Sequence, residues 1–108
     1  MDKVKLEIFY NAYDLYDLKI ERAVSKDDIL ELLIDMSSHL DLMGNGIRPV
    51  LDVEYHHLFR FKYEGPKISL KKDIKVLEYS FDENKIILNL NNKRLYLIGE
   101  PEVVLNYV

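Results

Sequence analysis

The sequence contains no cysteine, tryptophan, threonine or glutamine. Without cysteine, disulfide bonds, thiol catalysis and thiolate zinc sites are excluded. No apolar run approaches the about 20 residues that a membrane span requires. The first residues, MDKVKLEIFYN, lack the apolar core of a signal peptide. We therefore expect a cytoplasmic protein that has no membrane partner.

The composition is that of an ordinary globular protein. The chain has 108 residues, of which 48% are hydrophobic and 31% are charged, so residues 1–108 are predicted to form a single domain. A chain of this size builds one core and has little room for a deep substrate cleft. The net charge of −4 argues against non-specific binding to nucleic acid or to anionic membranes.

One amphipathic helix is predicted over about residues 26–42. Ser25-Lys-Asp-Asp28 is a variant of the capping box, with Asp in place of Glu at its fourth position. The acidic residues of this region suit the positive end of a helix dipole. Apolar residues follow at helical spacing as far as Met43, and Gly44 is a suitable residue to follow the helix.

The rest of the chain is predicted to form β-strands. Val4, Leu6 and Ile8 alternate with charged residues and predict a first strand. Residues 11–23 fit either a helix or a strand, and we favour a strand over 17–24, which would complete an N-terminal hairpin. Beyond Gly46 the apolar period is two, and turn residues divide the chain into strands at about 51–63, 68–70, 74–81, 86–90 and 94–98. The predicted fold class is α+β: the helix packs on an antiparallel meander of four to six strands.

Asp52, Glu54 and His56 are two residues apart and would share one face of a strand. Carboxylates and imidazole bind manganese, zinc or iron, so a metal-dependent hydrolase is one interpretation. The same alternation also places ordinary polar residues in solvent, while His57 falls on the apolar face. We favour a plain solvent face, and we expect no metal, no cofactor and no catalytic residues.

A basic stretch runs from residue 56 to residue 75. Six Lys or Arg and two Asp or Glu give it a local charge of +4, and Phe59, Phe61 and Tyr63 are interleaved with the cations. Proteins that bind single-stranded nucleic acid combine such cations with exposed aromatic rings. Alternation, however, separates the aromatic residues from the cations, so a nucleic-acid partner is the alternative interpretation. Its contact residues would be Arg60, Lys62, Lys71 and Lys72.

Tyrosines recur at three-residue spacing early in the chain, which has eight in all. Tyrosine is enriched at protein interfaces because its ring buries a large area while its hydroxyl still forms hydrogen bonds. We therefore predict a small non-enzymatic interaction module of the regulatory, inhibitor or anti-defence type. It would be a homo-oligomer that also binds a protein partner. The predicted interface consists of Tyr10, Tyr13, Asp14, Tyr16 and Asp17.

Overall fold

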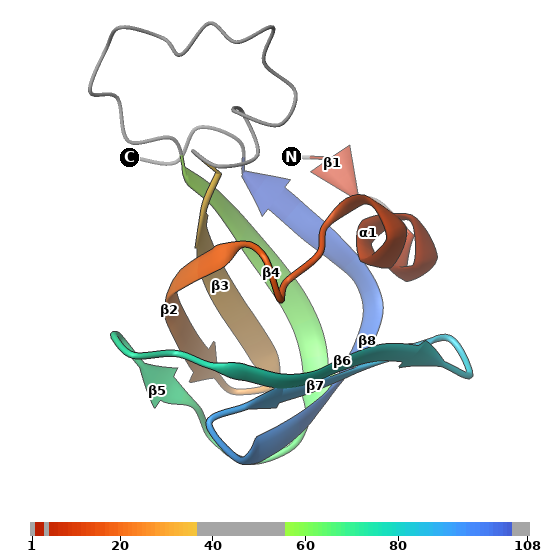
Figure 1. Ribbon diagram of the computed structural model, residues 1–108. Coiled ribbons are helices and arrows are strands. Elements are labelled where there is room, and N and C mark those ends of the chain that lie inside the picture. The colour runs from red at the N-terminus through yellow and green to blue at the C-terminus, as the bar shows by residue number, and fades with distance from the viewer. Residues whose placement is uncertain (1, 4, 37–55, 105–108) are drawn as a thin grey trace, which may run out of the picture.

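The computed structural model describes residues 2–3, 5–36 and 56–104. In these parts the chain forms one curled antiparallel sheet and one short helix (Figure 1). In chain order the elements are β1 (Asp2–Lys3), α1 (Leu6–Ala12), β2 (Lys19–Lys26), β3 (Ile29–Asp35), β4 (His56–Glu64), β5 (Ser69–Leu70), β6 (Val76–Asp82), β7 (Lys85–Leu90) and β8 (Lys93–Val104).

The strand order within the sheet is β5-β2-β3-β4-β8-β7-β6, and β1 pairs with β8. Figure 1 shows β6 and β7 crossing the molecule at a steep angle to β3 and β4, so the sheet curls around its own inner face. The two ends of this order are close in sequence, because β5 pairs with β2 and β6 pairs with β7. Residues 71–75 therefore connect one end of the sheet to the other.

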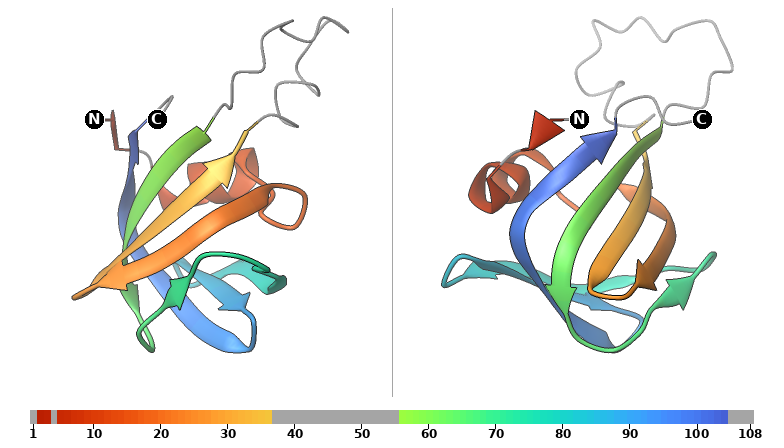
Figure 2. Two further views of the ribbon diagram at one scale, coloured as in Figure 1. Left: turned by 90° about the vertical axis from the view of Figure 1, so that its left-hand side faces the viewer. Right: turned by 180° about the vertical axis from the view of Figure 1, so that it is seen from behind.

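The core fills the inside of this curl. Alternate residues of each main strand point inward, as in Leu30, Leu32 and Ile34 of β3, all with no exposed surface. Phe9 of α1 is also fully buried, and its ring meets the rings of Phe59 and Phe61 edge-on at centroid distances of 4.9 Å. The helix thus packs against the inner face of the curl through the Phe9 ring. Figure 2 shows from two further sides where α1 lies relative to the curled sheet.

The predicted helix over 26–42 is wrong for the residues that the structure describes. Residues 29–35 form β3, which pairs with β2 through a tight turn, and Asp27 in that turn has a φ of 55°. The apolar side chains that become buried are those of period two, whereas Leu33 is only half-buried. Ser25 does not cap a helix, since its hydroxyl accepts a hydrogen bond from the N–H of Ile68 at 2.8 Å. Residues 37–42 of the predicted helix lie outside the described residues.

The first strand was also misplaced. Residues 6–12 form α1, because the side chains that become buried recur at helical spacing, as in Leu6 and Phe9. Ile8, which belongs to the alternating pattern, is 57% exposed. The error arises because apolar residues in this short segment fit both the two-residue period of a strand and the spacing of a helix.

The predicted strand over 17–24 is confirmed as β2, and the later hairpins are confirmed as well. Asn91 and Asn92 both have positive φ, at 50° and 69°, in the turn between β7 and β8. Glu83 and Asn84, in the turn between β6 and β7, also have positive φ. Two successive residues with positive φ are typical of a two-residue hairpin turn. The α+β class holds only broadly. The sheet has seven strands along its main path rather than four to six, and its helix is short and N-terminal.

Strand β8 is long and bends in its middle. Its register on β4 shifts between Arg60–Glu102 and Lys62–Ile98, so three residues of β8 lie opposite one residue of β4. Gly99 opens this bulge with a φ of 79°, a conformation that glycine adopts without steric cost. The bend lets one strand pair with β7 at one end and with β1 at the other.

No helix in the described parts of the chain has the length and apolar character needed to cross a membrane.

Candidate functional site

The predicted interface tyrosines lie on α1 and on the segment that leads into β2. Tyr10 and Tyr13 are half-buried, and their rings pack on aromatic side chains of the core. Tyr16 is 56% exposed. Asp14 and Asp17 are exposed as well, and the Asp14 carboxylate accepts a hydrogen bond from the N–H of Tyr16 at 3.0 Å. The predicted residues therefore share one region, but they are not equally accessible.

All three of these tyrosines form hydrogen bonds with Tyr79 of β6. The N–H of Tyr79 donates to the Tyr16 hydroxyl at 2.9 Å, and the Tyr10 hydroxyl donates to the Tyr79 carbonyl at 3.3 Å. The Tyr79 hydroxyl in turn donates to the carbonyl of Tyr13 at 2.7 Å. Tyr79 thus bonds the early segment through both of its backbone groups and its side chain.

The environment of Tyr79 disfavours its ionisation. The side chain is almost fully buried, and burial is the main cause that raises the pKa of its hydroxyl above the usual 10.0, followed by the charges of Tyr10 and Asp14. Sequence reasoning missed Tyr79, because the alternating pattern of one strand does not indicate hydrogen-bond partners more than sixty positions away.

The same bonds protect a sheet edge. β6 is the last strand of the main path, and an edge strand presents unpaired N–H and C=O groups that can pair with another chain. At Tyr79 both outward groups are occupied by tyrosine hydroxyls. Leu77, two residues earlier on the same strand, is 49% exposed.

The basic stretch 56–75 does not form a stacking platform. Phe59, Phe61 and Tyr63 are all buried in the core. Arg60 forms an ion pair with Glu31 at 2.6 Å, and Lys62 lies 4.0 Å from Asp28. Lys71 and Lys72 are exposed beyond the end of β5. The three lysines are exposed and Arg60 is half-buried. The rings that would stack on bases are buried, which weakens the nucleic-acid alternative.

The predicted metal set is only partly described. Asp52 and Glu54 lie outside the described residues, while His56 begins β4. Glu21 of β2 and Asp35 of β3 are close to His56: one ligand atom from each of the three residues lies within 4.8 Å of the others. His57 points to the inner face and is nearly buried, with its ring edge-on to that of Phe59. The structure therefore brings His56 together with two carboxylates that sequence reasoning did not select.

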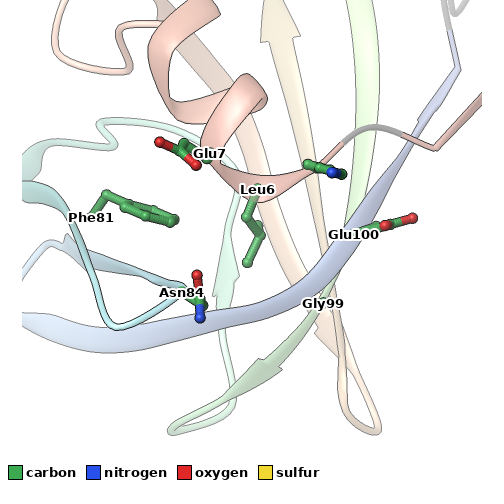
Figure 3. A pocket seen from close by; sticks show the side chains of 7 residues that line it. Leu6, Glu7, Phe81, Asn84, Gly99 and Glu100 are labelled. Atoms are coloured by element: carbon green, nitrogen blue, oxygen red, sulfur yellow. The ribbon is translucent and has the colours of Figure 1, made fainter.

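A shallow pocket of about 340 Å³ lies where α1 begins, beside the β6–β7 turn and the bulge of β8. Figure 3 shows the side chains of Leu6, Phe81 and Asn84 gathered in it, while Glu100 stands off beyond Gly99. Its volume is at the lower limit for small-molecule sites. Its charged residues, Lys5, Glu7 and Glu100, are all exposed, so the pocket offers no buried charged group that could orient a ligand.

Comparison with known proteins identifies no relative, since no family model, curated protein or solved structure matches the chain.

Proposed function

We propose that this protein is a small non-enzymatic interaction module that self-associates through the edge of β6. The contact surface, here called the Tyr16 surface, consists of Asp14, Tyr16, Asp17, Lys75 and Leu77. The observation that carries the proposal is that Tyr16 and Leu77 remain about half exposed at a sheet edge. With Ile8 on α1, they are the three large hydrophobic side chains exposed within the described residues.

We assign Tyr16 and Leu77 to one surface because both lie at the edge formed by β6, where Leu77 is the extra residue of a register shift between Val76 and Glu78. The Tyr16 hydroxyl is bonded to the backbone of Tyr79, and Leu77 is two residues away on the same strand, a distance of about 7 Å along the chain. Tyr16 is fixed at both ends: its hydroxyl accepts a hydrogen bond from the N–H of Tyr79, and its own N–H donates to the Asp14 carboxylate. A side chain that is already fixed loses little conformational entropy when it binds, so its burial is more favourable.

A second copy of the chain fits this surface by charge. Asp14 and Asp17 are exposed beside Tyr16, and Lys75 is exposed two residues before Leu77. In a twofold interface each surface meets its own copy, so the acidic residues of one protomer can face the lysine of the other. The two tyrosine bonds at Tyr79 block the addition of a partner strand there, so contact would occur through side chains.

The affinity should be modest. Full burial of a leucine contributes roughly 1.5–3 kcal/mol, and both exposed side chains are already half covered. We therefore expect association in the micromolar range, about −8 kcal/mol at its strongest, which becomes weaker as salt screens the charges.

Sedimentation velocity over about 5–500 µM protein, a range that spans micromolar association, tests this proposal. Leu77→Lys should shift the wild-type dimer to monomer by adding a charge to the apolar centre. Ile8→Lys is the matched control: the same substitution at a similarly exposed position on α1, which should leave the dimer intact. A wild type that remains monomeric throughout, or equal behaviour of the two variants, would contradict the proposed surface.

A further inference from the structure

We propose that Glu21, Asp35 and His56 form a binding site for a divalent transition metal, with Zn²⁺ as the best-matched ion. The three residues come from the adjacent strands β2, β3 and β4. They lie where β2 and β4 begin and where β3 ends. None of them belongs to the Tyr16 surface, so the inference is independent of self-association.

The sheet register brings these side chains together. Asp35 of β3 and His56 of β4 are directly paired across the two strands, and side chains opposite one another in such a pair start about 5 Å apart. Their inner-face neighbours, Ile34 and His57, are also paired and are buried. Asp35 and His56 therefore share the outer face of the sheet.

Glu21 reaches the same place because of a bulge. The register of β2 on β3 shifts between Ile20 and Arg22, which leaves Glu21 as the extra residue. A bulge redirects the side chain of its extra residue and is common beside functional sites. In this case it brings the Glu21 carboxylate to 4.0 Å from the Nε2 atom of His56.

The spacing suits a metal after small side-chain movements. Zinc binds nitrogen and carboxylate oxygen at about 2.0–2.2 Å in a tetrahedron, so its ligand atoms lie about 3.3–3.6 Å apart. The three ligand atoms already lie within 4.8 Å of one another. We infer that rotation of the three side chains can close the remaining gap.

Burial and charge also favour a cation. The His56 side chain is only 12% exposed and that of Glu21 is 35% exposed, so the ligands are partly shielded from water. Glu21 and Asp35 each bring a carboxylate to the imidazole of His56, and these donor groups suit a divalent cation. Lys19 lies 3.5 Å from Glu21 but is 74% exposed, and such an exposed pair contributes little. A divalent ion would compete with it effectively.

The donor set indicates which metal binds. One imidazole nitrogen and two carboxylates suit zinc, and for a given site of this type zinc binds more tightly than manganese or iron(II). Three protein ligands leave one tetrahedral position for water, as in open zinc sites.

Isothermal titration of the whole chain with ZnCl₂, after removal of metal by a chelator, tests the site. We expect one Zn²⁺ per chain in the wild type. His56→Asn, Asp35→Asn and Glu21→Gln should each weaken the affinity by about tenfold or more, at least the loss seen when even outer-shell partners of a metal are removed. Asp28→Asn is the matched control, since it makes the same chemical change in the exposed β2–β3 turn, and it should bind as the wild type does.

Two results would overturn the inference. One is the absence of saturable Zn²⁺ binding by the wild type at concentrations up to about 1 mM, the weak limit of specific binding. The other is unchanged affinity in both His56→Asn and Asp35→Asn, with circular dichroism showing that these variants are folded. Either result would leave the Leu77→Lys experiment unaffected.

Discussion

Replacement of Tyr79 by phenylalanine should destabilise the protein at neutral pH but much less in alkali. The change removes the hydroxyl that donates to the Tyr13 carbonyl at 2.7 Å and leaves the ring contacts in place. The net contribution of a hydrogen bond is about 1 kcal/mol, and removing one partner of a buried bond costs more, so we expect a loss of about 1–2 kcal/mol. For a domain of this size each kcal/mol lost corresponds to a fall in Tm of about 4–8 °C.

The pH dependence follows from the raised pKa of Tyr79. In the folded state the hydroxyl stays protonated, whereas in the unfolded chain it ionises near its usual pKa of 10.0. Above that pH the unfolded state binds fewer protons than the folded state, so stability falls as pH rises. The contribution is therefore complete below about pH 10 and is lost progressively above it, by about 1.4 kcal/mol at pH 11.

Phenylalanine has no proton to lose, so the variant lacks this dependence. The difference in unfolding free energy between wild type and Tyr79→Phe should shrink from about 1–2 kcal/mol at pH 8 to near zero at pH 11. Urea denaturation at pH 8, 9, 10 and 11 measures it, and the comparison cancels other titrating groups. Tyr96→Phe, on the outer face of β8, is the control and should show a small effect. A Tyr79→Phe difference that stays constant with pH would refute the reasoning.

Two further substitutions test the fold. Phe9→Ala should cost about 3–5 kcal/mol in urea denaturation, because Phe9 is fully buried between Phe59 and Phe61; a loss below about 1 kcal/mol would mean that α1 is not packed in the curl. Gly99→Ala should cost about 1–2 kcal/mol by the same assay because its φ is 79°. The added Cβ meets no atom closer than 3.9 Å, so an unchanged stability would show that β8 does not bend at this residue.

The sequence predicts the C-terminal hairpins well because their signals are local. Asn91-Asn92 supports a turn with two positive φ values, and in β7 before it buried residues alternate with less buried ones. The same local reasoning fails at residues 26–36, where apolar side chains fit both periods. The choice between helix and strand there depends on β4, a distant segment whose Phe59 and Phe61 pair with Leu32 and Leu30 of β3.

The candidate sites divide in the same way. Tyrosine spacing indicates the region of residues 10–17, but the residue that organises it, Tyr79, is brought there by the tertiary fold. His56 is a candidate metal ligand on the sequence alone, as part of the alternative set with Asp52 and Glu54. Its neighbours Glu21 and Asp35 are not, because one depends on a bulge and the other on strand register.

The three bonds between the early tyrosines and Tyr79 also determine when this chain can finish folding during synthesis. They join residues 63, 66 and 69 positions apart, and a ribosome adds about 5–20 residues each second. The N-terminal segment, with its aromatic side chains, therefore emerges seconds before the strand that receives it. During that interval the aromatic rings of the nascent chain are exposed to chaperones. Once β6 has been synthesised, the tyrosines of residues 10–16 can bind Tyr79 and protect the edge of that strand.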